Sequence, residues 1–304
     1  MNRSMLICLT LPLTVALAGC TDDGPGGDPD DDETGITTIT VGDGDGDPTT
    51  PGDGDGDPTG DGDGDPTGDG DGDGDPSCGE VEIVPEYVPP NVMLVVDASG
   101  SMVSEANNWD HDLDVNTPEV TRWFSLHGVV DTVMTNFGGA MYAGIQRFPS
   151  ADACDPNPCY NITSCTTAGT PEVSVGLDNG AAILSAIPGP DAGSEDIEGG
   201  TPATKGIDSA VAHLLTQPEE LARYILFVTD GAANCNTALP FPDYIETYDE
   251  TLPTTVDSAF MDEGITTFVV GIDIIDELVG AGADGAPEAN AFERLNDVAV
   301  AGGA

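Results

Sequence analysis

The chain is nearly without basic side chains. Its 304 residues hold 6 Lys and Arg against 56 Asp and Glu, a formal net charge of −50. Nucleic acids are gripped through Lys and Arg, so this chain should repel them, and we predict no nucleic-acid partner. The acidity is not confined to one tail, because residues 78–304 alone carry 36 acidic and 5 basic side chains.

Histidine and lysine are also scarce. There are 3 His, and Lys205 is the one lysine of the chain. No Ser-His-Asp or Cys-His set is evident among these histidines, which argues against nucleophilic catalysis. The sequence therefore predicts a protein that is not an enzyme.

Apolar runs long enough to span a membrane are absent. The one candidate, residues 5–18, follows Arg3 and is too short for a comfortable span. It ends in Leu17-Ala18-Gly19-Cys20, which resembles a bacterial lipoprotein cleavage box. That resemblance makes residues 1–20 a signal peptide and Cys20 the lipid-bearing first residue, anchored in the bacterial cell envelope. Thr21 favours the outer membrane. An ordinary secretory signal with a chance cysteine is the alternative.

Residues 21–77 form a low-complexity acidic segment. It has 19 Asp, one Glu and no Lys or Arg, and it repeats Gly-Asp-Gly-Asp-Gly-Asp-Pro-Thr. With almost no apolar side chains it cannot offset the entropy of ordering, so we predict a disordered, extended spacer. Calcium binding is the alternative. Against it, Pro48, Pro58 and Pro66 stand where an EF-hand loop needs glycine.

The most informative stretch is residues 91–102, NVMLVVDASGSM. Its apolar, β-branched start predicts a strand buried on both faces. Asp97, Ser99 and Ser101 then follow at alternate positions, and Gly100 lets the backbone fold so that both hydroxyls face one point. Oxygen ligands in a tight loop suit a hard cation such as Mg²⁺.

Two later positions supply matching oxygens. Thr201 stands between Gly200 and Pro202, where it is expected to cap a helix, and Asp230 ends the apolar run of residues 224–229. Because ligands gather at the carboxyl ends of parallel strands, we predict that both join the first loop in one metal site. Taken singly, each of these residues could be no more than a cap or a turn.

This order of residues, Asp-x-Ser-x-Ser followed by a distant Thr and a distant Asp, resembles the von Willebrand factor type A family and its metal-ion-dependent adhesion site. The resemblance covers about residues 88–304. It implies a doubly wound α/β domain with a mainly parallel, Rossmann-like sheet and helices on both faces. It also implies a further strand and helix after the last residue of this chain.

The resemblance assigns roles as well. Ser99, Ser101 and Thr201 would bind Mg²⁺, or Mn²⁺ or Ca²⁺, directly, while Asp97 and Asp230 would act largely through bound water. A carboxylate from a partner protein would complete the coordination of the ion. The function expected is metal-dependent protein binding at the cell envelope. The alternatives are a structural surface lipoprotein with an inert domain and a Mg²⁺-dependent phosphohydrolase. The latter would need an aspartate where Ser99 stands.

The remaining pattern fixes further elements and the cysteines. We expect strands at residues 81–84, 140–148, 172–177 (an antiparallel edge), 224–229 and 265–272, and helices at 118–137, 179–187, 203–216, 243–263 and 288–300.

An exported location favours disulfides, and the insertion at residues 149–169 should be held by disulfide bonding. Five cysteines are left once Cys8 leaves with the signal and Cys20 is lipidated, so one lacks a partner within the chain and the pairing stays open. The candidates are Cys78, Cys154, Cys159, Cys165 and Cys235.

Overall fold

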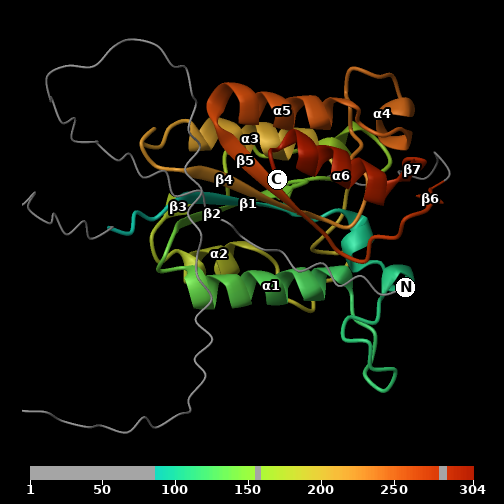
Figure 1. Cartoon of the computed structure of the whole chain (residues 1–304). Helices are drawn as coiled ribbons and strands as arrows, with labels where there is room; N and C mark the ends of the chain where they lie inside the picture. The colour runs from blue at the N-terminus through green and yellow to red at the C-terminus, as the bar shows by residue number, and fades with distance from the viewer. Residues whose placement is uncertain (1–85, 155–158, 281–285) are drawn as a thin grey trace, which may run out of the picture. The chain divides into compact units, whose positions relative to one another are not determined.

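The computed structural model describes residues 86–154, 159–280 and 286–304 (Figure 1). These belong to one compact unit, Gly79–Ala304. The predicted signal peptide with Cys20, the acidic spacer, the strand at 81–84 and Cys78 lie outside the described residues. Within the described part, no helix has the length and apolar character needed to cross a membrane.

A five-stranded sheet forms the centre of this unit, in the order β3-β2-β1-β4-β5. β1 runs parallel to β2 and to β4, β4 runs parallel to β5, and β3 pairs antiparallel with β2. The predicted α/β class and the predicted antiparallel edge are confirmed, and the sheet is therefore mixed. The strands are β1 Asn91–Asp97, β2 Tyr142–Phe148, β3 Val173–Gly176, β4 Arg223–Thr229 and β5 Ile265–Gly271.

Helices lie on both faces of the sheet (Figure 1). One face carries α1 Arg122–Phe137 and α2 Gly180–Ala186. The other carries α3 Ala203–Leu214, α5 Thr251–Glu263 and α6 Ala291–Ala301. Smaller elements are the short helix α4 Asp243–Glu246, the antiparallel pair β6 Leu278–Val279 and β7 Ala289–Asn290, and the 3₁₀ turns η1 Gly100–Val103, η2 Glu105–Asn107 and η3 Ile162–Cys165.

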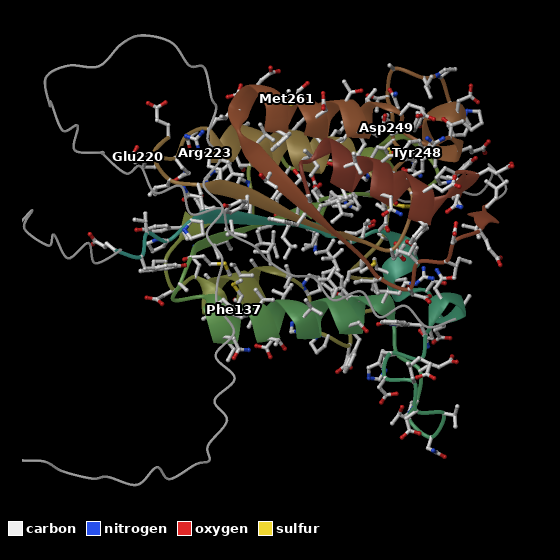
Figure 2. The ribbon with its side chains drawn as sticks, in the orientation of Figure 1. Phe137, Glu220, Arg223, Tyr248, Asp249 and Met261 are labelled. Carbon is white, nitrogen blue, oxygen red and sulfur yellow. A yellow bond between two sulfur atoms is a disulfide. The ribbon has the colours of Figure 1, made fainter. Side chains whose placement is uncertain are left out.

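The central strand β1 divides its side chains between two apolar cores, because neighbouring residues of a strand point to opposite faces. Met93 and Val95 pack with the core that includes Phe227 from β4. Leu94 and Val96 pack with the core that includes Trp123 from α1. All of these side chains are buried, as the continuous apolar run predicted, and Figure 2 shows side chains filling the space between the sheet and the helices.

Two of the predicted helices differ clearly from those observed. α1 begins at Arg122 and not at residue 118, because the Thr121 hydroxyl accepts the Phe124 amide at 3.1 Å and caps the helix. Val120 is held outside the helix by a bridge to Trp109. The helix expected at 243–263 is divided into α4 and α5, but Pro253 does not cause the break: it stands in the first turn of α5, where its missing N–H leaves no hydrogen bond unmade.

Candidate functional site

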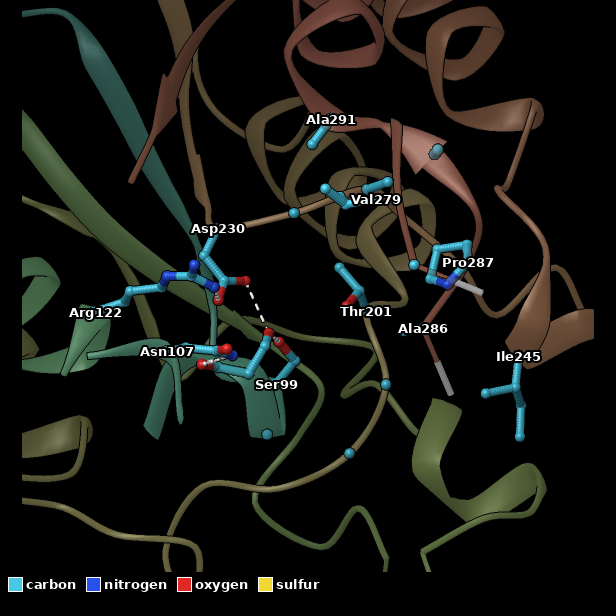
Figure 3. A pocket seen from close by; sticks show the side chains of 18 of the residues that line it. Ser99, Asn107, Arg122, Thr201, Asp230, Ile245, Val279, Ala286, Pro287 and Ala291 are labelled. Atoms are coloured by element: carbon cyan, nitrogen blue, oxygen red, sulfur yellow. Dashed lines mark hydrogen bonds and ion pairs between the residues drawn. The ribbon is translucent and has the colours of Figure 1, made fainter. Parts of the chain in front are cut away.

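The predicted site residues meet at one edge of the sheet. β1 ends at Asp97 and its parallel neighbour β4 ends at Thr229, so the loops that follow leave the sheet side by side. Ser99, Ser101, Thr201 and Asp230 all line one pocket of about 680 Å³ at this edge (Figure 3).

Asp97 does not line this pocket but ends β1, directly before the loop that does. Its carboxylate is fully buried, with Oδ1 accepting the Ser99 amide at 2.8 Å and Oδ2 accepting the Thr229 hydroxyl at 2.5 Å. The side chain therefore fixes the start of the Ser99 loop and ties it to the end of β4. Asp97 therefore orients the residues of the site without lining the pocket.

The two serine hydroxyls face each other and Asp230. Ser99 Oγ and Ser101 Oγ lie 2.9 Å apart, and Ser101 Oγ donates to Asp230 Oδ1 at 2.9 Å. Ser99 precedes η1, yet its side chain makes no capping hydrogen bond. Both hydroxyls are thus turned toward the pocket, and neither serves as the helix cap that was the alternative.

Thr201 reaches the pocket from the segment before α3 (Figure 3). Its prediction as the cap of that helix is wrong, because Pro202 directly precedes the helix and no side chain caps it. The backbone of Thr201 is held by Asn234 instead. Thr201 N donates to Asn234 Oδ1 at 2.8 Å, and Asn234 N donates to Thr201 O at 3.0 Å.

Arg122 and Asp273 belong to the site, and sequence reasoning missed both. Arg122 Nη1 donates to Asp230 Oδ2 at 2.9 Å, while its Nε and Nη2 donate to Asp273 Oδ2 at 3.1 and 2.7 Å. The signal for Arg122 was rarity, since it is one of 6 basic residues in the chain. The signal for Asp273 was position, since it follows β5, the next parallel strand at the same edge.

The electrostatics of this edge favour a cation. Burial, followed by the nearby charge of Asp230, raises the pKa of Asp97 to about 7. Burial also raises the pKa of Asp230, although the Arg122 guanidinium opposes that shift. The edge holds three carboxylates and one guanidinium: Arg122 pairs with Asp230 and Asp273, while Asp97 accepts hydrogen bonds from uncharged donors only. A bound cation would relieve this excess of negative charge, so the residues present fit a divalent ion.

We expect the affinity for Mg²⁺ to fall as the pH is lowered. The pKa of Asp97 in the folded, metal-free protein lies above its ordinary value of 3.8, so the metal-free fold loses stability as the pH rises from about 4 to 7. Mg²⁺ requires the ionised form and must displace the proton. The dissociation constant measured by calorimetry should rise about tenfold per unit below pH 7, with one proton released. A constant that is flat between pH 5.5 and 8 would contradict this linkage.

The cysteines form two disulfides in the described residues. Cys154 pairs with Cys159 inside the insertion, and Cys165 pairs with Cys235 beyond β4. The expectation of a stapled insertion is confirmed. The ligand atoms of Cys154, Cys159 and Glu198 lie within 4.8 Å of one another. Because both sulfurs are consumed in a disulfide, no thiolate is left there to bind a metal.

Comparison with known proteins gives little. No protein-family model matches the chain, and no curated protein matches it. The solved structures that it resembles include the pilus adhesin SpaC of Lactobacillus rhamnosus GG, at 19% identity and a TM-score of 0.41, over 61% of this chain and 25% of that one. The PilB minor pilin of Streptococcus sanguinis aligns at 17% identity and a TM-score of 0.38, over 62% and 52%. The chain thus spans about half or less of their length, and likeness at this level transfers no function.

The identification with the von Willebrand factor type A family is therefore wrong. No family model matches the chain, so the order of these five residue types does not place it in that family. The physical reason is that a few hydroxyls and carboxylates meet wherever parallel strands end together, whatever the ancestry of the chain. The grouping of Asp97, Ser99, Ser101, Thr201 and Asp230 stands on the contacts alone.

Proposed function

We propose that this chain is a divalent-cation-dependent protein-binding module displayed on the bacterial cell surface. The observation that carries the proposal is the pocket at the carboxyl edge, where Ser99, Ser101, Thr201 and Asp230 converge above the buried Asp97. Hydroxyl and carboxylate oxygens are the ligands that Mg²⁺, Mn²⁺ and Ca²⁺ prefer.

Each residue has a distinct part in holding the ion. The hydroxyls of Ser99, Ser101 and Thr201 would bind it directly, and Asp97 and Asp230 would orient them and accept hydrogen bonds from bound water. Asp230 already shares its charge with Arg122. Since the direct ligands are neutral, much of the positive charge of the ion remains to attract an anion. We infer that this anion is a carboxylate of a partner protein.

The opposite wall of the pocket suggests what else the partner presents. The apolar residues that line the pocket include Ile274, Ile275, Val279 and Pro287, and Ile275 is 51% exposed and Val279 39% exposed. Figure 3 shows Val279 and Pro287 across the pocket from Asp230. An acidic residue flanked by an apolar one would use both walls. The rest of such a partner should be neutral or basic, because the net charge of this chain repels an acidic protein.

The proposal includes binding without catalysis. Among the described residues that line the pocket there is no His and no Lys, and the one basic group, Arg122, is engaged by two carboxylates. Display at the surface rests on the signal segment, Cys20 as a lipid anchor and the acidic spacer of residues 21–77. Loss of the anchor on replacing Cys20 with Ser would be seen as release of the protein from the membrane fraction.

A peptide selection tests the binding proposal. The chain is immobilised in excess Mg²⁺, exposed to a random peptide library, and eluted with EDTA. We expect the eluted peptides to share an Asp or Glu beside an apolar residue, and to lose binding when that acid becomes Asn or Gln. Peptides that bind equally well in EDTA would overturn the proposal.

A further inference from the structure

The position of Thr201 is set by residues outside its own segment. Residues 199–202 belong to no helix or strand. Gly199 O accepts Gly100 N at 3.1 Å, and three hydrogen bonds hold the next two residues: Gly200 N donates to Ser164 O at 3.0 Å, Thr201 N donates to Asn234 Oδ1, and Asn234 N donates to Thr201 O. Gly200 and Thr201 are therefore held by two separate loops, one through Ser164 and one through Asn234.

The residues that make these contacts are the chain neighbours of a disulfide. Ser164 precedes Cys165 and Asn234 precedes Cys235, and the two cysteines are bonded to each other with 1% and 3% exposure. The backbone at Gly200 packs directly against the Cys165–Cys235 disulfide. A Cβ added at Gly200 would lie 2.9 Å from Cys235 Sγ and 3.0 Å from Asn234 Oδ1, which only glycine avoids.

Besides the disulfide, Tyr160 joins the two loops, since its ring lies 5.4 Å from that of Phe241 and its hydroxyl donates to Glu246 just beyond the second loop. Residues 231–242 contain no helix or strand, and the apolar cluster around the disulfide consists of the two cysteines with Tyr244 and Ile245. Asn234 is fixed from the far side, since its Nδ2 donates to Ile245 O at 2.8 Å. The disulfide joins loops that lie 70 residues apart in the chain. Without the disulfide, both loops would gain conformational entropy.

We propose that the Cys165–Cys235 disulfide and Asn234 are positioning residues for Thr201, so that the cation site is complete only in the oxidised chain. The inference rests on the proposed function, because it assigns Thr201 to the bound ion. It goes further in making cation binding depend on the redox state of one disulfide. The second disulfide, Cys154–Cys159, cannot serve as the control, because Cys159 lines the same pocket and both sulfurs lie within 4.8 Å of a Glu198 oxygen, next to the segment.

The test compares full-length chains by Mn²⁺ calorimetry and by amide hydrogen exchange without metal. In the double variant Cys165→Ser, Cys235→Ser, we expect Mn²⁺ affinity to fall at least tenfold, in the range seen when groups that orient metal ligands are removed. The Gly200 and Thr201 amides should lose protection while those of β1 and β4 keep it. As the control, Asp112→Ala, in an exposed loop outside the pocket, should change neither quantity. Affinity within twofold of the unmodified chain in the first variant would overturn the proposal.

Asn234→Ala keeps the disulfide and separates positioning from folding. It should weaken Mn²⁺ binding and reduce the protection of the Thr201 amide against hydrogen exchange. The midpoint of thermal unfolding should stay above the temperature of these measurements, so that the chain is folded in both. If the Cys165 and Cys235 variant does not fold, this variant decides. Should the unmodified chain bind no Mn²⁺, the proposed function fails. The exchange of the Gly200 and Thr201 amides then still decides whether the disulfide and Asn234 hold the segment.

Discussion

Replacement of Asp97 by Ala is expected to abolish saturable binding of Mg²⁺ and Mn²⁺. The carboxylate accepts the Ser99 amide and the Thr229 hydroxyl, so its removal frees the loop that presents both serine hydroxyls. It also removes one of the three carboxylates that make the edge negative. Calorimetry on the full chain should show the binding heat falling to that of the acidic spacer, which the variant retains.

Stability should change less than binding in this variant. Two donors left without an acceptor cost about 1–3 kcal/mol each, but removing a buried carboxylate whose pKa is raised by burial offsets part of that loss. Asp112→Ala is the matched control, because it removes the same charge from an exposed loop. A saturable binding heat that survives in Asp97→Ala, or that disappears equally in Asp112→Ala, would contradict the site.

Replacement of Arg122 by Gln is expected to lower the free energy of unfolding by about 3 kcal/mol in metal-free buffer, since breaking a buried pair leaves an uncompensated charge. Asp230 and Asp273 both lose their partner, and the side chain of Asp230 is 1% exposed. Mg²⁺ should restore more stability in this variant than in the unmodified chain, because the ion takes over the role of the guanidinium. Denaturant unfolding with and without Mg²⁺ measures both effects.

Arg294→Gln gives the comparison for Arg122. Arg294 pairs with Glu250 at 3.2 Å, and both side chains are more than a third exposed. Exposed pairs contribute about 0–1 kcal/mol, so this variant should lose little stability and gain nothing extra from Mg²⁺. Equal losses in the two arginine variants, or the same response to Mg²⁺, would show that Arg122 is an ordinary surface ion pair.

Patterns along the chain predicted the central strands well. The run ending at Asp97 and the run ending at Thr229 are continuously apolar, and a strand between two layers of helices has no other way to bury both faces. Once these strands are parallel neighbours, their polar ends must meet. For that reason the grouping of Ser99, Ser101 and Asp230 in one pocket followed from sequence.

Contacts between distant segments could not be predicted from the sequence. Arg122 lies 108 residues from Asp230 along the chain, and nothing in local spacing pairs them. The helix was expected to start at residue 118, because Pro118 is a good first residue, but a hydrogen bond of Thr121 decided the matter. Disulfide pairing depends on folded geometry in the same way, so the four cysteines could be named but not matched.

The family assignment failed for a different reason. It rested on five residue types in a fixed order, which describe the end of a parallel sheet and not a line of descent. The same residues retain their meaning as chemistry, because hydrogen bonds join Asp97, Ser99, Ser101 and Asp230 in the fold and Thr201 lines the same pocket. The contacts at the site therefore support the proposed chemistry, whereas membership of a known family does not.

The most direct test of the account is an X-ray structure of crystals soaked in Mn²⁺, with the anomalous signal of the ion recorded. The account predicts one strong peak in the pocket, within bonding distance of the hydroxyl oxygens of Ser99, Ser101 and Thr201, and none in crystals of Asp97→Ala. A peak elsewhere on the chain, or an empty pocket at saturating Mn²⁺, would contradict it.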